Sequence, residues 1–306
     1  FPFFSPLGRP RTGHGVPEPL VSLSRGNNAS RWLLGAFGFY RHGTMNAPVH
    51  FKQTGIEELI LKYANENDQS YRYSWGLKDG TGGDELFLGS DFRMPSAGCA
   101  RYHESNYTLS RLRFSAGLRF DFEHARLRYR NYTDTWYTKT RIKDDAVYEL
   151  QLEIDDRSTL KQTFTELLPK FSVMYSFDET RNLYLTIAKG YKSGGFNTQI
   201  FSDVLQQKMM NRMGIGEVYD VQRGVAYKPE YSWNYEIGGH FSCMEGAVRG
   251  DFALFYIDCR DQQLTVFPPG QTTGRMMTNA GRTRSLGAEA AVQISPWRTF
   301  DINLAY

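Results

Sequence analysis

The chain has 306 residues, of which 41% are hydrophobic and 15% aromatic, with a net charge of +3 and a mean hydropathy of −0.50. A helical membrane protein is excluded, because the longest apolar run, Trp32–Tyr40, reaches only about half of the roughly 20 residues that a spanning helix needs. The small net charge and the lack of any block of like charges argue against a nucleic-acid partner.

Many aromatic residues in so polar a chain need a separate explanation. The sequence contains 19 Tyr, 21 Phe and 5 Trp, which is more than a small soluble core would use. In a transmembrane β-barrel every second residue faces lipid, and the residues between them face water. This architecture accounts for low hydropathy, many aromatic residues and many charges together, so the composition favours it.

Strand-like alternation recurs in four segments of the chain. In Leu112–Phe122 the even positions are apolar, and the odd positions are mostly charged or small. Apolar and polar residues alternate in the same way in Tyr231–Cys243, Leu286–Ile294 and Phe300–Tyr306. Because the side chains of a strand point alternately to its two faces, each segment is predicted to be a strand between lipid and water. The predicted fold class is therefore an all-β, antiparallel transmembrane β-barrel.

The breaks between strands fall into two classes. Five short polar breaks are predicted to be tight hairpin turns, at Gly26–Ser30, Glu123–Ala125, Asp178–Arg181, Met244–Gly246 and Ser295–Arg298. Longer irregular stretches separate the hairpins, at Arg41–Tyr102, Tyr191–Pro229, Arg260–Thr278 and, with less distinct limits, Tyr137–Gln162. Five hairpins correspond to about ten strands. Short turns that alternate with long loops are typical of outer-membrane barrels, in which the short turns are periplasmic.

Three other segments affect how the chain is divided. Ala146–Ile154 alternates in polarity, which fits either a further strand or a β-extension of a loop. Ile56–Ala64 fits a helical turn within a loop. Phe1–Pro10 has neither an initiator Met nor the layout of a signal peptide, so we expect the chain to be a mature fragment.

A series of motifs occurs in a fixed order along the chain. The longest are KGYKSGGFN at Lys189–Asn197, YKPEYSWNYEIG at Tyr227–Gly238, FYIDCRDQQ at Phe255–Gln263 and NAGRTRSLGAE at Asn279–Glu289. Shorter ones precede them at Trp32–Gly38, Ala116–Asp121 and Leu168–Lys170. Together these motifs resemble the barrel of TonB-dependent outer-membrane receptors, the active transporters of Gram-negative bacteria. The resemblance is strong from about Cys99 to Tyr306, and most of Arg41–Gly98 has no counterpart.

The resemblance implies an architecture and an activity. The family's barrel has 22 strands, so residues 1–306 correspond to about ten of them, and an N-terminal plug domain and the last strands are expected outside this sequence. The implied location is the outer membrane of a Gram-negative bacterium, in contact with outer-membrane lipid. The implied function is active uptake of a scarce solute, energised by a TonB-type inner-membrane partner acting through the plug. A ferric siderophore is the expected cargo, with cobalamin, haem or glycans as alternatives.

Two other classes of function compete with active transport. A passive porin or a surface-adhesion barrel would need neither a plug nor a partner-binding segment, so the upstream sequence would discriminate it. An outer-membrane protease or lipase barrel would need a dyad of Ser, His, Asp or Glu in the lumen or at the rim. No such constellation stands out in the sequence, so we do not expect an enzyme.

The predicted hairpin around Glu123 would carry a basic inner wall. Six arginines of its two strands are predicted to point into the lumen: Arg111, Arg113, Arg119, Arg126, Arg128 and Arg130. Leu127 and Tyr129 alternate with them and are predicted to face lipid. Such a wall would draw anionic substrates inward. The alternative is that the arginines pair with carboxylates such as Asp121, or with those of the plug.

Loop residues at the outer mouth are further candidate substrate contacts. The candidates are Arg212, Arg223, Arg260, Gln262 and Arg275, with the aromatic residues Tyr219 and Phe267 near them. Binding usually concentrates on polar loops of this kind. For each residue the alternative is an ordinary solvated loop side chain.

No metal or cofactor site is predicted. His42, His50 and His103 match no ligand spacing, and His240 is expected to form a hydrogen bond inside the lumen. Asp79–Glu85 lacks the spacing of a known calcium loop and is interpreted as a polar turn. The three cysteines, Cys99, Cys243 and Cys259, form no CxxC pair. A bridge between the last two is implausible, because they are predicted near opposite membrane surfaces.

Overall fold

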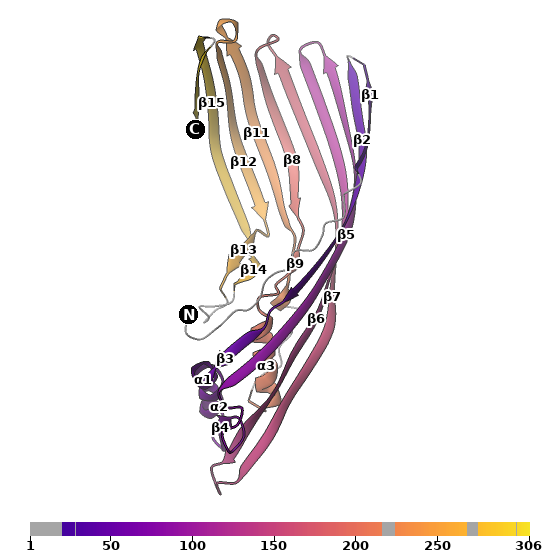
Figure 1. Ribbon diagram of the computed structural model, residues 1–306. Coiled ribbons are helices and arrows are strands. Elements are labelled where there is room, and N and C mark those ends of the chain that lie inside the picture. Colours follow the sequence, from indigo (N-terminus) through magenta and orange to yellow (C-terminus); the bar gives the residue numbers. More distant parts are fainter. Residues whose placement is uncertain (1–19, 28, 216–223, 268–274, 298) are drawn as a thin grey trace.

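The computed structural model describes residues 20–27, 29–215, 224–267, 275–297 and 299–306 and consists mainly of long antiparallel strands (Figure 1). Within these ranges, twelve strands form one sheet, with the main order β1-β2-β5-β6-β7-β8-β11-β12-β15-β16. The strands of this path are β1 (Leu20–Gly26), β2 (Ser30–Asn46), β5 (Glu85–Leu109), β6 (Leu112–Arg141), β7 (Val147–Ser176), β8 (Asn182–Lys192), β11 (Glu230–Cys243), β12 (Val248–Arg260), β15 (Arg282–Trp297) and β16 (Phe300–Ala305). The prediction of an all-β, antiparallel fold with about ten strands is confirmed. In the described part of the chain, β1 and β16 are the two ends of this path, so the barrel is not closed.

Tight hairpins connect neighbouring strands at one end of the sheet, which we call the short-turn end (the upper end in Figure 1). The predicted turns at Gly26–Ser30, Asp178–Arg181 and Met244–Gly246 are confirmed. In the last of these, a 3₁₀ turn named η2 (Met244–Gly246), Gly246 has a φ of +90°, which glycine adopts without steric cost. The turn predicted at Ser295–Arg298 lies slightly later, because β15 continues to Trp297. Residue 298 lies outside the described residues.

The turn predicted at Glu123–Ala125 is wrong. This segment lies inside the uninterrupted strand β6, and the hairpin between β5 and β6 instead turns at Ser110, whose φ is +54°. The polar residues near Glu123 mark the level at which the outward face of the strand stops being apolar, and the strand itself continues. Outside hydrocarbon a strand no longer needs an apolar outer face, so polarity alone does not indicate a turn there.

Continuity of β6 reverses the predicted faces of the residues beyond Glu123. The pairing of β6 with β7 is in constant register along nearly the whole strand, so odd and even positions keep their faces. Leu127 and Tyr129 share the inner face with Arg119 and are only 0% and 6% exposed. Arg126, Arg128 and Arg130 therefore point outward, and the prediction that they line the lumen with Leu127 and Tyr129 facing lipid is wrong.

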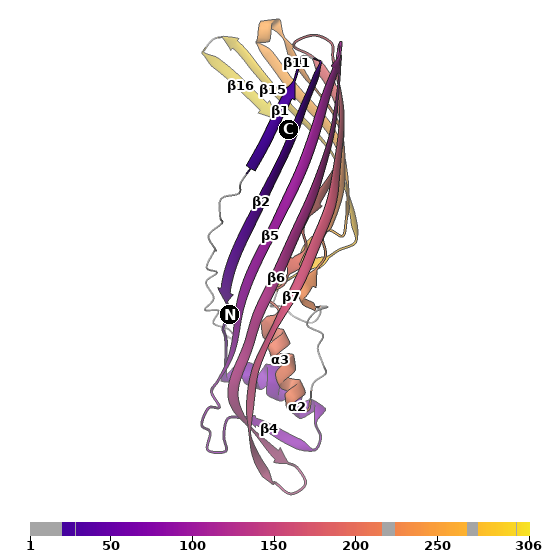
Figure 2. The ribbon, with the colours of Figure 1, turned by 90° about the vertical axis from the view of Figure 1, so that its right-hand side faces the viewer.

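The opposite, long-loop end carries the remaining elements (Figures 1 and 2). They are β3 (Val49–Lys52), α1 (Gln53–Ile56), η1 (Glu57–Leu61), α2 (Lys62–Asn67), β4 (Tyr71–Trp75), β9 (Gly195–Phe196), α3 (Phe201–Arg212), β10 (Ala226–Tyr227), β13 (Gln263–Val266) and β14 (Met276–Asn279). The predicted long stretches at Tyr191–Pro229 and Arg260–Thr278 are confirmed as connections between main strands. The stretch predicted at Arg41–Tyr102 is shorter, because β2 reaches Asn46 and β5 begins at Glu85.

The two ambiguous segments are resolved at this end. Ala146–Ile154 is a β-extension, because β7 begins at Val147 and pairs with β6 from there onward. The predicted stretch at Tyr137–Gln162 is consequently mostly strand. The helical interpretation of Ile56–Ala64 is confirmed by the continuous run of α1, η1 and α2.

Helix α3 is the centre of a hydrophobic layer on the inner face of the long strands. Its residue Phe201 is fully buried, with its ring centre 4.9 Å from that of Phe92 and 4.7 Å from that of Tyr129. Leu205 and Met209, further along the helix, are buried in a second cluster that includes α1, α2 and β4. Because one helix belongs to both clusters, it fixes the ends of β5, β6 and β7 to the loop that connects β2 and β5.

Toward the short-turn end the apolar residues lie on the outward face of the sheet, whereas near α3 they lie on the inner face. Leu118, Phe120, Leu167 and Phe171 are between 45% and 49% exposed and lie side by side on β6 and β7. An apolar outer band over a polar inner wall is the arrangement expected of a barrel in lipid. Among the described residues, none of the helices combines the length and hydropathy needed to cross a membrane.

The central position of Phe201 predicts a local effect of its truncation. Changing Phe201 to Ala removes a fully buried ring, which typically costs about 3–5 kcal/mol. We expect faster hydrogen exchange throughout α3 in the purified protein, and unchanged heat resistance of the sheet. The control Gln207→Ala alters an exposed side chain of the same helix and should change local stability by less than about 0.5 kcal/mol. Equal exchange in the two variants would contradict the central role of Phe201.

Candidate functional site

The inner wall of β5 and β6 retains only part of the predicted basic surface. Arg119 is half-buried, and its Nε donates a hydrogen bond to Oδ1 of Asp121 at 2.7 Å. Arg113 is exposed and lines a cavity of about 360 Å³ near the short-turn end. Arg111 lies in the turn itself, where its carbonyl accepts a hydrogen bond from the Ser176 amide at 2.8 Å. Of the six arginines predicted to line the lumen, Arg113 and Arg119 lie on the inner wall. Arg119 is already paired with Asp121.

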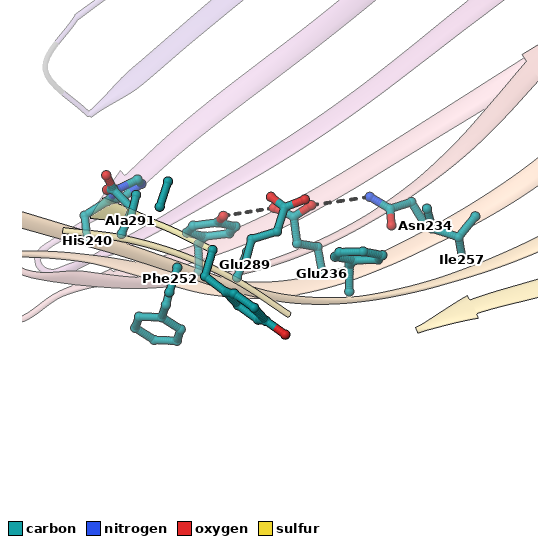
Figure 3. Close-up of a pocket in the computed structure, with 14 residues that line it drawn as sticks. Asn234, Glu236, His240, Phe252, Ile257, Glu289 and Ala291 are labelled. Carbon is teal, nitrogen blue, oxygen red and sulfur yellow. Dashed lines mark hydrogen bonds and ion pairs between the residues drawn. The ribbon is translucent and has the colours of Figure 1, made fainter. Parts of the chain in front are cut away.

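A larger hollow of about 690 Å³ lies on the inner wall where β8, β11, β12 and β15 run side by side (Figure 3). Its ionisable residues other than tyrosine are Glu236, His240, Asp251 and Glu289. One oxygen of Glu236 accepts a hydrogen bond from the hydroxyl of Tyr184 at 2.9 Å, and the other accepts one from Nδ2 of Asn234 at 3.5 Å. Three carboxylates make this half of the wall acidic, which suits cations and hydroxyl or amide donors.

His240 and Asp251 face each other across β11 and β12 and form a hydrogen-bonded pair. The predicted hydrogen bond of His240 on the inner face is confirmed. A hydrolase would need a nucleophile bonded to such a pair. Ser242 lines the adjoining cavity with His240 and Asp251, but among the described residues it forms no hydrogen bond with either of them. We therefore interpret the pair as a polar part of the wall. Across the described ranges, no group of three or more His, Cys, Asp or Glu residues is arranged to hold a metal ion.

At the long-loop end, the loop between β8 and β11 is joined to the loop between β12 and β15 by side-chain amides. The amide of Asn197 donates to the carbonyl of Met277 at 2.8 Å and accepts from its N–H at 2.6 Å. Asn279 pairs in the same way with Lys228, at 2.9 Å and 2.8 Å, and also donates to the carbonyl of Asp261 at 2.8 Å. Each asparagine thus occupies the place that a backbone partner would take in a sheet.

Gln263 completes this junction from a buried position. Its backbone N–H donates to Glu230 at 2.7 Å, and its side-chain amide donates to the carbonyls of Ser193 at 2.8 Å and Lys228 at 3.1 Å. We call Asn197, Gln263 and Asn279 the amide junction. It holds the two loops in one arrangement at the long-loop end, where the pieces β9, β10, β13 and β14 lie (Figure 1).

The loop candidates from the sequence are not brought into one pocket. Gln262 lies at the base of the β13–β14 hairpin, where its carbonyl accepts from the Ala280 amide at 2.7 Å. Arg275 lies at the other end of this hairpin, with its guanidinium 5.7 Å from the ring centre of the exposed Phe267. Arg212 ends α3 and is exposed. Arg223 and Tyr219 lie outside the described residues.

Arg260 occupies a different environment from the one predicted. The register of β12 with β15 pairs it with Arg282 on the outward face, around the carboxylate of Asp258. Arg282 donates to both oxygens of Asp258, at 2.5 Å and 2.7 Å, and Nε of Arg260 lies 3.9 Å from one of them. Asp258 and Arg282 lie in two different motifs of the sequence, and no sequence pattern predicts that their side chains pair.

Helix α3 is also held by a charged contact beneath the loops. Lys208 forms an ion pair with Asp156 of β7. Burial raises the pKa of the Tyr129 hydroxyl next to this pair, and the charge of Asp156 raises it further. The hydroxyl is therefore protonated at physiological pH, so Tyr129 adds no negative charge beside the paired Lys208 and Asp156.

Comparison with known proteins agrees with these features. Residues 15–306 match the family model described as TonB dependent receptor-like, beta-barrel. The pesticin receptor of Yersinia enterocolitica is 28% identical over 145 residues, which are 47% of this chain and 18% of that protein. The solved structure of the ferric yersiniabactin uptake receptor FyuA from Yersinia pestis is 16% identical, with a TM-score of 0.44, over 94% of this chain and 41% of that one. The alcaligin outer membrane receptor FauA from Bordetella pertussis is 12% identical, with a TM-score of 0.34, over 94% and 52%. The chain thus spans about half or less of the length of these proteins.

The amide junction predicts that the two loops open together. Changing Asn279 to Ala removes three hydrogen bonds, and the loss at such an exposed site is about 1–3 kcal/mol. We expect the amide of Lys228 to exchange with solvent roughly tenfold faster or more, with no change in β11 and β12. Hydrogen exchange followed by mass spectrometry measures both.

Gln262→Ala is the matched control, because Gln262 adjoins the junction and its hydrogen bonds to Gly281 and Ala280 are made by its backbone. This variant should leave the exchange of Lys228 within about twofold of the wild type. Protection of Lys228 that survives in Asn279→Ala, or is lost equally in Gln262→Ala, would show that the junction does not hold the loops.

Proposed function

Because the chain belongs to the TonB-dependent receptor family, whose β-barrel model matches residues 15–306, we propose that it forms part of the barrel of an active uptake receptor. Proteins with this barrel reside in the outer membrane of Gram-negative bacteria. In this assignment the short-turn end faces the periplasm and the long-loop end faces the outside. The proposed cargo is a scarce solute. Among such solutes we favour a ferric siderophore, as the resemblance of the motifs implies.

The observation that carries the proposal is the opposite polarity of the two faces of the sheet near the short-turn end. The outward face there presents large apolar side chains, such as Phe120 and Leu167, whereas the inner face presents Arg119, Glu236 and Glu289. Such a wall encloses water or another protein segment and has no use in a soluble sandwich, whose inner faces pack against each other. A water-filled or plugged lumen is what a transporter needs.

The unpaired ends of the sheet support a larger assembly. Free N–H and C=O groups on a sheet edge are not viable in hydrocarbon, and β1 and β16 are unpaired with each other in the described part of the chain. We infer that further strands close the barrel, toward the 22 strands of the family. We further propose that a plug domain fills it and engages a TonB-type partner.

The substrate would first meet the long-loop end. Gln262, Arg275 and Arg212 remain proposed contacts there, with Phe267 as an exposed aromatic neighbour of Arg275. The amide junction supports this assignment, because it gives these loops a fixed arrangement on which a ligand can be recognised. Arg260 is a weaker candidate, because its side chain lies on the outward face. There it is next to Arg282 and to the carboxylate of Asp258, with which Arg282 also pairs.

Growth under iron limitation tests the proposed function. A strain that lacks the complete gene should fail to grow on one ferric siderophore and grow normally on ferric citrate or haem. The complete gene should restore growth, and it should not do so in a strain without the TonB-type partner. Normal growth of the deletion strain on every siderophore would remove the iron assignment. Restoration that does not need the partner would indicate a passive porin.

The inner arginines predict a graded effect on transport. If Arg113 and Arg119 attract an anionic ligand through the lumen, uptake should fall in the order wild type, R113Q/R119Q and R113E/R119E. The last variant should be slowed by roughly tenfold, at the low end of electrostatic steering effects. Binding of labelled ligand to whole cells should not change, because both residues lie near the short-turn end. Equal uptake by all three correctly folded proteins would contradict the steering role.

A further inference from the structure

The outward face changes character abruptly above the apolar band of β6. Phe120 and Phe122 are exposed on this face, and His124 follows them. At about 3.4 Å per residue and a tilt of about 40°, the rise from Leu112 to Phe122 is roughly 26 Å, close to the height of the lipid-facing band of outer-membrane barrels. With the short-turn end in the periplasm, as proposed above, the residues that follow Phe122 lie at the level of the outer-leaflet headgroups.

Four basic side chains occupy this level on three adjacent strands. They are Arg93 of β5, Arg126 and Arg128 of β6 and Lys161 of β7, and we call them the cation quartet. The register places Arg93 directly opposite Arg128, and Arg126 directly opposite Lys161. Like charges that face each other across strands destabilise a sheet, so an anion bound between them would relieve this repulsion.

Among the described residues, no carboxylate forms an ion pair with the quartet. Asp91 shares the outward face, opposite Arg130, and accepts a hydrogen bond from Asn46. The Nε of Arg126 donates to the ring nitrogen Nε2 of His124 at 2.9 Å, which supplies no negative charge. Arg93, Arg128 and Lys161 are exposed.

The next level outward differs in this respect. Arg130 and Arg157 face each other there, and both bind Asp155, with nitrogen–oxygen distances of 2.9 Å and 2.7 Å. The hydrogen bonds from Arg157 and Arg130 hold the pKa of the Asp155 carboxyl well below its usual range. The same strands therefore supply a carboxylate to one pair of cations and none to the quartet just below it.

We propose that the cation quartet binds the phosphate groups of the outer-leaflet lipid, the phosphorylated glycolipid of Gram-negative bacteria. Guanidinium groups match phosphate oxygens in geometry and charge, and basic clusters beside an apolar surface are the usual form of a lipid headgroup site. The apolar band below would contact the acyl chains of the same molecule.

Lipid binding by the purified full-length receptor tests this proposal. The probes are lipid A with both phosphates and the same lipid after chemical dephosphorylation, each titrated in detergent and followed by native mass spectrometry. The wild type should bind the phosphorylated form at least tenfold more tightly. The variant R93Q/R126Q/R128Q/K161Q should lose this preference, and inorganic phosphate at millimolar concentration should not displace the lipid.

The matched control is R130Q/R157Q, which removes two cations from the same face one level further out. Its lipid binding should stay within about twofold of the wild type, because Asp155 already neutralises those two arginines. Equal loss in the control, retained binding in the quartet variant, or displacement by inorganic phosphate would each overturn the proposal.

Two further measurements keep the test decisive if the quartet variant fails to insert. The wild type alone must discriminate between the phosphorylated and the dephosphorylated lipid, and R128Q alone should weaken binding by about threefold to tenfold. Siderophore uptake is scored separately, so failure of lipid binding leaves the proposed transport function standing, and failure of uptake does not affect the lipid result.

Discussion

Pairing in a constant register between neighbouring strands is the constraint on which this structure depends. A backbone group without a partner is too costly in hydrocarbon, so strands that cross a membrane must pair along their whole length. From β5 to β12 each described ladder keeps one register, and an irregularity occurs only near the end, between Ile294 and Trp297. Because the register does not shift, each residue's face is fixed by whether its position is odd or even.

The alternating pattern made the membrane-spanning part of the fold predictable from the sequence. Leu112–Phe122 alternates strictly, since one of its faces meets lipid and the other meets water. Beyond Phe122 this rule no longer holds, because both faces are hydrated or covered by protein. Leu118 and Leu127 show the difference, since the first is 48% exposed on the outward face and the second is fully buried under α3. The sequence alone does not reveal that helix, so the polar residues near Glu123 resemble a turn although they lie inside β6.

The candidate site was less predictable because its contacts are distant in sequence and depend on folded loops. Asn197 and Met277 are 80 residues apart, and Asn279 and Lys228 are 51 residues apart. An asparagine in a loop is ordinarily a turn residue, and nothing in the surrounding sequence shows that its side chain will bond to another loop. The motifs around Asn197 and Asn279 carried the resemblance to the family. The amide junction gives a physical reason for polar residues at these two positions.

Three arginines on one strand show how position determines the role of a side chain. On β6, Arg119 faces inward and is paired with Asp121, whereas Arg130 faces outward above the membrane and is paired with Asp155. Arg128 lies just below Arg130 on the same face, opposite another arginine and without a carboxylate. In water such an arrangement costs little, because exposed charges are screened. At the edge of hydrocarbon screening is weaker, so the repulsion persists until an anion from the membrane itself is bound there.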